Sequence, residues 1–204
     1  MYVWSLVTLL EQSWIREVVI VAPPDMVPEI KKQTAALIER FPNQSLNVVA
    51  GGDTRQESVY LGLQAMIERP PEFVMIHDAA RPFLTAEIVQ RVNEGVIKCG
   101  AVTTGVAPSD TIKRVENHSV AETLDRRSLL LVQTPQAGRY DWLIDAHRSA
   151  HENGLATTDD AAVLEAAGHK VGIVGGANFN MKVTQPEDLI LAEALAAIVF
   201  KDRL

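Results

Sequence analysis

The acidic and basic side chains of the segment HDAARPF, residues 77–83, are the first candidates for chemistry in this sequence. The segment follows FVMI, a short apolar run typical of a buried strand. Asp78 can accept hydrogen bonds or face a metal ion, Arg81 can pair with a carboxylate or a phosphate, and small Ala79 leaves room for a ligand. The alternative is a structural clasp in which Asp78 and Arg81 close the turn. His77 is then a structural residue at the end of the strand.

A second candidate is the Gly-Gly-Asp corner that ends at Asp53. Gly52 allows the backbone to approach a ligand closely, and Thr54 and Glu57 have the spacing of a helix capping box. The start of such a helix offers unpaired N–H groups, and Asp53 and Ser58 can bind polar edges of a ligand. The alternative is an ordinary turn. The spacing matches neither a dinucleotide fingerprint nor a P-loop.

Two basic residues, Arg126 and Lys182, stand among uncharged or small neighbours and can bind phosphate. The alternative for each is a solvated surface charge. Thr111, Thr134 and Thr158 offer hydroxyls at the ends of segments, where most threonines cap or turn the backbone. We find no Ser/His/Asp triad, zinc-ligand spacing or carboxylate pair in the sequence.

The elements that must position these residues alternate in type along the chain. Continuous apolar runs predict strands, and apolar residues at helical spacing predict helices between them. This order predicts an α/β fold with a doubly wound, mostly parallel sheet that helices cover on both faces. The strands are expected at 17–24, 46–52, 73–77, 101–108 and 170–176, and the helices at 3–14, 30–41, from 54, 86–98, 140–152, 159–168 and 186–200. The segment LLLVQTPQ, residues 129–136, lies between the hairpin region and the helix at 140–152.

Three polar corners follow strands of this predicted sheet: residues 51–53, 77–81 and 107–111. In open α/β sheets ligands bind beyond the carboxyl ends of the strands. We therefore expect the three corners to share one rim of the sheet and one pocket, which Arg126 and Lys182 complete.

Residues 109–127 interrupt the α/β pattern, because they are polar with short alternation in TIKRV and SVAETL. They predict a β-hairpin arm outside the main layers. An isolated hairpin is marginally stable in water, so we expect it to pack on a second copy of the chain.

Composition places the chain among globular proteins of one domain, residues 1–204 with the arm included. Of its 204 residues, 47% are hydrophobic and 22% charged, and a net charge of −7 argues against a nucleic-acid-binding protein. The charge is compatible with a small anionic substrate, since a few basic side chains can focus a local positive field. The one cysteine, Cys99, excludes an internal disulfide, fits a reducing compartment and is expected to be partly buried. No apolar run reaches the roughly eighteen residues of a membrane span.

Six ordered fragments together resemble the 2-C-methyl-D-erythritol 4-phosphate cytidylyltransferase family. The resemblance covers nearly the whole chain and implies a Rossmann-like nucleotidyltransferase fold. It implies transfer of CMP from CTP to methylerythritol phosphate with release of pyrophosphate, in non-mevalonate isoprenoid precursor synthesis. It also implies a Mg²⁺ cofactor, a cytoplasmic homodimer joined through the arm, and no nucleic-acid or membrane partner. The fragments are GGDTRQESV, HDAARPF, APSDTIKRV, LDRRSLLLVQTPQ, ATTDDAAVLE and NMKVTQPEDL.

The resemblance also implies roles for the candidate residues. Asp78 and Ala79 would lie between nucleotide and sugar phosphate, with Asp78 next to the magnesium. Arg126 and Lys182 would be the catalytic pair that aims the acceptor phosphate, and Thr111 and Arg126 would serve the neighbouring subunit's site. The cytidine would be held by Gly52, Asp53 and Ser58, and the methylerythritol phosphate by Asp78, Arg81, Thr111, Arg126, Thr134, Thr158 and Lys182.

One part of the family pattern has no counterpart here. The family opens with a strand, a glycine-rich loop containing an Arg, and a later Pro-Lys-Gln, whereas this chain starts at Met1 inside the expected first helix. We therefore expect an N-terminally truncated chain, shorter by roughly thirty residues, with a break in the middle of its sheet. We also expect weak nucleotide binding and slow or no turnover. An organelle address would belong to the same upstream region.

Three other functions are considered. A ribitol-5-phosphate cytidylyltransferase shares the HDA and TPQ corners, but Asp125-Arg126 before QTPQ favours methylerythritol phosphate. An inactive, dimerising nucleotide-binding fragment is a second alternative. A nicotinamide dehydrogenase ranks last, because no strand is followed by the dinucleotide glycine spacing.

Overall fold

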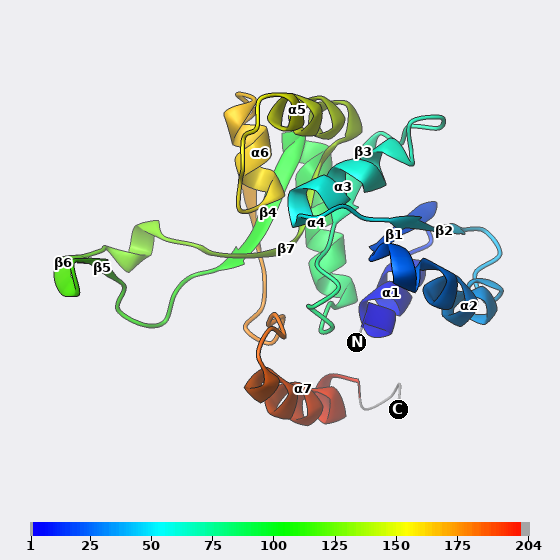
Figure 1. Cartoon of the computed structure of the whole chain (residues 1–204). Coiled ribbons are helices and arrows are strands. Elements are labelled where there is room, and N and C mark those ends of the chain that lie inside the picture. Colours follow the sequence, from blue (N-terminus) through cyan, green and yellow to red (C-terminus); the bar gives the residue numbers. More distant parts are fainter. Residues whose placement is uncertain (1, 201–204) are drawn as a thin grey trace.

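The computed structural model describes residues 2–200 (Figure 1). Every predicted helix and strand is present, with ends shifted by a few residues, and the α/β class is confirmed. The helices are α1 Tyr2–Leu10, α2 Val27–Ile38, α3 Arg55–Gln64, α4 Ala86–Cys99, α5 Tyr140–Glu152, α6 Asp160–Ala166 and α7 Pro186–Val199. The strands are β1 Glu17–Ala22, β2 Ser45–Ala50, β3 Phe73–Ile76, β4 Ala101–Val106, β5 Lys113–Glu116, β6 Ser119–Thr123, β7 Leu131–Arg139 and β8 Gly172–Gly175.

The larger sheet of the body has the strand order β3-β7-β4-β8. Strand β7 runs antiparallel to both β3 and β4, and β4 pairs in parallel with β8. Three strands therefore share one direction, as a mostly parallel sheet requires, and β7 is the exception. The sequence did not reveal this reversal, because apolar alternation does not encode strand direction.

Helices cover both faces of the larger sheet. On one face α4 buries Ile88, Val92 and Val96 against Val102 of β4. On the other face α5 and α6 pack with α3 against β3 and β4, in a cluster that includes Leu143. Both clusters are close to fully buried, so these faces form the core that holds the strand ends in place.

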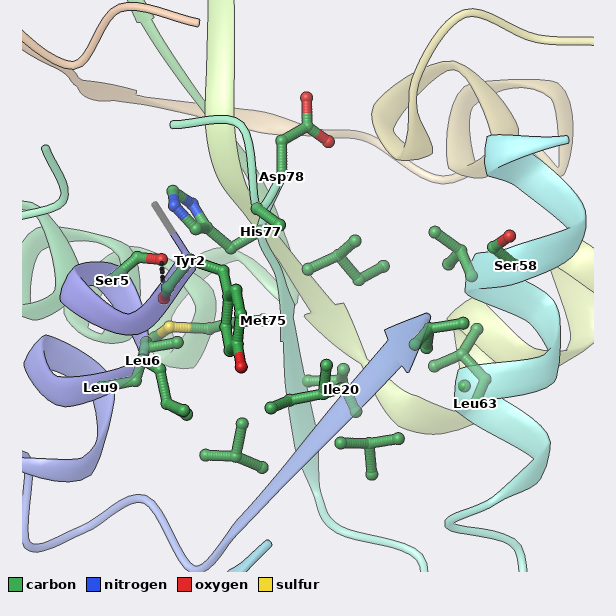
Figure 2. Close-up of a pocket in the computed structure, with 18 of the residues that line it drawn as sticks. Tyr2, Ser5, Leu6, Leu9, Ile20, Ser58, Leu63, Met75, His77 and Asp78 are labelled. Carbon is green, nitrogen blue, oxygen red and sulfur yellow. Dashed lines mark hydrogen bonds between the residues drawn. The ribbon is translucent and has the colours of Figure 1, made fainter. Parts of the chain in front are cut away.

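A second, two-stranded sheet is formed by parallel β1 and β2, and it stands apart from the larger one (Figure 1). Within residues 2–200, no ladder joins β1 to β3. The side chains of both strands line the same apolar cavity, with Ile20 and Met75 on facing walls (Figure 2). The break expected in the middle of the sheet is therefore present between β1 and β3.

Two helices connect the two sheets. In α3, Gly62 lies against Val21 of β1, while the next residue, Leu63, belongs to the core of the larger sheet. In α1, Tyr2 packs towards the β1–β2 side and Leu9 towards α4. The start of α3 is thereby fixed relative to both sheets.

Helix ends follow local chemistry. Thr54 caps α3 by accepting a hydrogen bond from the Glu57 N–H at 3.1 Å, as predicted. Helix α4 ends at Gly100, whose φ of +79° is the left-handed conformation that favours glycine. Cys99, just before this end, is exposed, so the expectation of a partly buried thiol was wrong. It lies on the outer face of the last turn, whereas Val96 one turn earlier is buried.

The predicted arm is confirmed as the hairpin β5–β6, which projects from the body in Figure 1. Its two turn residues, Asn117 and His118, have φ values of 48° and 62°, as expected for a tight hairpin turn. Every residue of both strands is exposed, including Val115 and Val120. Within the described chain the arm therefore packs on no other element.

Helix α7 packs on α1 and on the segment after β3 through an aromatic cluster. Phe83, which is fully buried, stacks on Phe200 with ring centroids 5.8 Å apart, and Trp4 of α1 lies 4.8 Å from Phe200. The cluster ties the start of the chain, the segment after β3 and the end of α7 together. Neither α7 nor any other described helix is long and apolar enough to cross a bilayer.

Candidate functional site

Asp78 lies directly after β3 and is the centre of a charged cluster at the carboxyl end of the sheet. Its Oδ1 accepts a hydrogen bond from Arg55 Nε at 2.9 Å, and its Oδ2 lies 2.9 Å from Lys182 Nζ. Burial by itself would raise the pKa of this carboxyl. Lys182 and Arg55 outweigh that effect and hold the pKa below its usual value, so Asp78 is a carboxylate at neutral pH.

A short hydrogen-bond chain orients Asp78. Its backbone N–H donates to Thr134 Oγ1 at 3.0 Å, and Thr134 Oγ1 lies 3.2 Å from His77 Nδ1. His77 Nε2 in turn lies 2.9 Å from the Arg81 carbonyl oxygen. The carbonyl partner requires a hydrogen on Nε2, and because burial lowers the pKa of His77 to about 4, Nδ1 is unprotonated at neutral pH and accepts from the threonine hydroxyl. Thr134, predicted as a ligand-binding hydroxyl, is buried and serves this turn.

Arg81 does not clasp Asp78. Its guanidinium donates to two backbone carbonyls, that of Asn180 at 2.9 Å and that of Val132 at 3.4 Å. The proposed Asp78–Arg81 side-chain clasp was therefore wrong, and the turn is closed instead by the Arg81 N–H bonded to the Asp78 carbonyl. Through Asn180, Arg81 anchors the segment that carries Lys182.

The Gly-Gly-Asp corner lies beside this cluster, at the start of α3. The Gly52 N–H donates to Ser58 Oγ at 3.2 Å, and the Asp53 N–H donates to Glu57 Oε2 at 2.9 Å. The Asp53 residue is exposed. Because the corner and Asp78 are both bonded to α3, the structure brings Gly52, Ser58 and Asp78 to one rim.

Three charged or polar residues of the cluster were not predicted. Arg55 bridges two acids, because its Nη2 also binds Asp160 Oδ2 at 2.7 Å. Asp160 is almost fully buried, and its Oδ1 lies 3.3 Å from Nε2 of the buried His147. One signal was available: His147 falls on the apolar face of its helix, between Leu143 and Ala150.

Charge explains why these buried groups are tolerated. Burial would raise the pKa of Asp160, but contacts with His147 and Arg55 keep it below its usual value. Burial would likewise lower the pKa of Arg55, and the two carboxylates raise it instead. Asp160 and Arg55 are therefore both ionised at neutral pH, and their opposite charges offset the free-energy cost of burying each group.

The loop before α6 carries Thr158, which is exposed. Its neighbours are fixed: the Thr157 N–H donates to Gln56 Oε1 at 2.9 Å, and Gln136 Nε2 donates to Asp159 Oδ2 at 2.8 Å. Thr158 thus lies on a loop that is bonded both to α3 and to β7.

Thr111 and Arg126 are not brought to Asp78 within one chain. Both lie on the segments that flank the hairpin arm, and both are exposed. The Arg126 guanidinium donates to the carbonyl of Ser109, across the base of the arm. Their separation from Asp78 within one chain leaves the expectation that Thr111 and Arg126 serve a neighbouring subunit's site as a prediction.

The cavity between β1 and β3 has a volume of about 280 Å³ and opens at the carboxyl end of the strands. Its walls are apolar, while Arg55, Ser58, Asp78 and Ala79 line the polar end. In Figure 2 the Asp78 carboxylate points away from the apolar centre, towards the rim. Polar groups of a ligand can therefore form hydrogen bonds at the rim but not in the apolar interior of the cavity.

The fit of Mg²⁺ to these residues was assessed from their donor set. Among residues 2–200, no group of three or more His, Cys, Asp or Glu side chains is arranged to hold a metal ion. Asp78 and the exposed Asp53 offer carboxylates at this rim, and each Asp78 oxygen already has one cationic partner. Mg²⁺ commonly takes one or two carboxylates and completes its shell with substrate phosphates and water. The described rim therefore supplies at most part of such a shell.

A pH prediction follows from His77. Burial lowers its pKa from the ordinary 6.5 to about 4. Between pH 4 and pH 6.5 the unfolded chain carries a proton on His77 that the folded chain lacks. The contribution of neutral His77 to the free energy of unfolding is therefore complete above pH 6.5 and is lost as the pH falls towards 4. We expect it to reach at most about 3 kcal/mol. Urea unfolding of the parent and of His77→Gln at several pH values measures it. A parent and variant with equal pH dependence across this window would contradict the assignment.

Comparison with known proteins gives one consistent result. The family profile described as 2-C-methyl-D-erythritol 4-phosphate cytidylyltransferase matches residues 1–197. A protein of that name from Halalkalibacterium halodurans is 40% identical over 188 residues, which is 92% of this chain and 80% of that protein. The bifunctional enzyme IspD/IspF of Desulforudis audaxviator is 50% identical over 149 residues, which is 72% of this chain and 37% of the relative.

Solved structures agree with the sequence matches. The 2-C-methyl-D-erythritol 4-phosphate cytidylyltransferase of Thermus thermophilus superposes with a TM-score of 0.79 at 33% identity, covering 96% of this chain and 88% of that one. The 4-diphosphocytidyl-2C-methyl-D-erythritol synthase of Anaerococcus prevotii superposes with a TM-score of 0.85 at 28% identity, covering 95% and 87%.

Proposed function

Since this chain belongs to the 2-C-methyl-D-erythritol 4-phosphate cytidylyltransferase family, we propose that it transfers CMP from CTP to 2-C-methyl-D-erythritol 4-phosphate and releases pyrophosphate. The observation that carries the proposal is the cluster of Asp78, Arg55 and Lys182 at the sheet rim, beside the Gly52–Ser58 corner. The step belongs to non-mevalonate isoprenoid precursor synthesis. A cytoplasmic location is part of the same proposal.

The chemistry asks the protein chiefly for positioning. A phosphate oxygen of the acceptor attacks the α-phosphorus of CTP, and the bond from that phosphorus to the β-phosphate oxygen breaks. The acceptor oxygen is already ionised near neutral pH, so no protein nucleophile or strong base is required. What remains is to hold two anions in line and to neutralise charge that develops on the phosphoryl oxygens.

The proposed roles follow the rim. The Gly52 corner, Asp53 and Ser58 hold the cytidine part, and Ala79 leaves the backbone open to the nucleotide. Lys182, whose side chain is 41% exposed, is free to turn from Asp78 to the acceptor phosphate. Arg81 positions the Lys182 segment, and Thr134 fixes the Asp78 turn. Thr158 faces solvent on the fixed loop and can donate to the acceptor.

Mg²⁺ belongs to the proposal as an ion delivered with CTP. Asp78 would supply its one protein carboxylate. When bound, such an ion neutralises phosphate charge and favours the in-line arrangement.

A second copy of the chain is proposed to complete the site. The arm is fully exposed, carries Thr111 and Arg126 at its base, and is an isolated two-stranded hairpin that needs packing. We propose a homodimer in which each arm reaches the partner's rim, so that Arg126 approaches the acceptor phosphate there.

Mixing two inactive variants tests the shared site. Arg126→Ala and Lys182→Ala chains should each lose most turnover alone. An equal mixture should regain about a quarter of parental activity, since half of the dimers are mixed and each holds one intact site. The measurement is pyrophosphate release after unfolding and refolding the mixture together. Recovery no greater than the sum of the separate variants would refute a site shared between subunits.

Steady-state pyrophosphate release tests the activity itself. Whatever turnover CTP and Mg²⁺ support is expected to be much greater with methylerythritol phosphate than with ribitol 5-phosphate. Preference for ribitol 5-phosphate would support the related cytidylyltransferase. Calorimetric binding of CTP with no turnover on either acceptor would support a nucleotide-binding module instead.

A further inference from the structure

Five charged or titratable side chains form one continuous chain from the rim into the core. In order they are Lys182, Asp78, Arg55, Asp160 and His147, and acids alternate with basic groups. The successive contacts measure 2.9, 2.9, 2.7 and 3.3 Å. The Lys182 side chain at one end is 41% exposed, whereas Asp160 and His147 at the other end are 1% and 0% exposed. Asp160 and His147 are therefore too deeply buried to contact a ligand at the rim.

Arg55 links the rim side of this series of side chains to its buried side. Its guanidinium has a fixed fork of donors, and Nε points to Asp78 while Nη2 points to Asp160. An arginine with a single acid could take both of its oxygens in a bidentate pair. Because Asp160 takes one arm of the fork, Arg55 contacts only Oδ1 of Asp78, and Oδ2 remains with Lys182.

Asp160 can act as a fixed anchor because it is itself immobilised. It is the first residue of α6, is 1% exposed, and lies against His147 of α5. The preceding Asp159 caps the same helix by accepting from the Ala162 N–H at 2.9 Å. Gln136 of β7 binds both Asp159 and the Ala161 N–H. Asp160 is thus held by α5, α6 and β7, which belong to the larger sheet and the helices that cover it.

The residue next to Arg55 makes a parallel connection. Gln56 accepts from the Thr157 N–H and donates to the Leu155 carbonyl at 2.8 Å. The first turn of α3 is therefore bonded to the segment 155–160 through both Arg55 and Gln56. On the proposed function, α3 carries the cytidine side of the site and this segment carries Thr158 of the acceptor side.

We propose that Asp160 and His147 are positioning residues which hold Arg55 in its bridging orientation and so align the nucleotide corner with the acceptor loop. This inference rests on the proposed function. The two residues act through Arg55 and make no contact with the substrates.

A purely structural role is the rival interpretation, since removing one partner of a buried ion pair is strongly destabilising. The two roles differ in coupling. If Asp160 acts through Arg55, its replacement has no further effect once Arg55 can no longer bridge. If Asp160 only stabilises the fold, its replacement leaves the Kd of the folded protein unchanged, and if it affects the ligand independently of Arg55, the two effects multiply. Either result contradicts the proposed coupling.

A double-mutant cycle on CTP affinity separates them. Asp160→Asn keeps the shape of the side chain, and Arg55→Lys keeps the charge but loses the fork. Each is expected to raise the Kd for CTP about tenfold, and the double variant is expected to match Arg55→Lys. Calorimetry well below the melting temperature measures the four constants. A double variant weakened about a hundredfold would overturn the proposal.

Asp145→Asn is the matched control. It breaks an exposed pair with Arg148 on α5, the helix that carries His147, and should leave the Kd unchanged. If Asp160→Asn does not fold, the same cycle is run with His147→Gln, and multiplying effects there overturn the proposal equally.

A second readout does not depend on the ligand. The Arg55 Nε–H signal in nitrogen-detected NMR should be slowly exchanging in the parent and in Asp145→Asn, and should broaden in Asp160→Asn. Failure of the parent to bind CTP would count against the proposed function alone. An Arg55 signal unchanged by Asp160→Asn would remove the positioning role whatever the activity.

Discussion

Replacing Asp78 by asparagine is expected to lower kcat/KM for CMP transfer by about 10²- to 10³-fold. The carboxylate is the one anion between Arg55 and Lys182, at 2.9 Å from each. An amide of the same shape removes that charge and turns an N–H₂ group towards one of the two cations. Lys182 is then free to leave its position, and any ion that arrives with CTP loses its protein carboxylate.

Pyrophosphate release at saturating and limiting CTP measures this change. Asp141→Asn is the control, because it breaks an exposed pair with Arg139 away from the rim and should keep parental activity. Thermal unfolding of both variants separates lost folding from lost function. An Asp78→Asn enzyme with kcat/KM within threefold of the parent would show that Asp78 takes no part in the reaction.

Replacing Phe83 by alanine is expected to lower the free energy of unfolding by about 3–5 kcal/mol. Phe83 is fully buried and stacks on Phe200, with Trp4 6.1 Å away. Its removal leaves a cavity between α1, α7 and the segment after β3. Val183, next to Lys182, belongs to the same cluster, so the rim should loosen as well.

Denaturant unfolding followed by circular dichroism measures the loss. Phe41→Ala removes the same side chain at a half-buried position after α2 and should cost clearly less. A loss below about 1 kcal/mol for Phe83→Ala would mean that the aromatic cluster does not hold α7 in place.

The elements of this fold could be predicted because their signals are local. Buried runs such as FVMI, capping spacing at Thr54 and the polar hairpin sequence each depend on near neighbours. The start of α7 is likewise local, because Asp188 accepts from the Thr184 and Gln185 N–H groups just before it. The direction of β7 and the break beside β1 depend on pairing between distant segments, and no short window contains them.

The candidate site divides in the same way. Asp78 was found because a polar residue after a buried strand is unusual by itself. Arg55 and Asp160 were missed, since they are 105 residues apart and each resembles an ordinary charged residue in the first turn of a helix. Arg81 was found but given the wrong partner, because the carbonyls it binds come from β7 and the segment before Lys182. The roles of Thr111 and Arg126 depend on a second copy and remain proposals.

The separation of β1–β2 from the larger sheet has a consequence for how the molecule comes apart. Within residues 2–200 the two sheets share no ladder, and α1 and α3 are the helices that pack on both. We therefore expect the β1–β2–α2 portion to form its own cooperative unit, which can open while the remainder stays closed. A single melting midpoint would then describe neither portion. The Gly52 corner, which follows β2, would lose its structure together with the less stable portion.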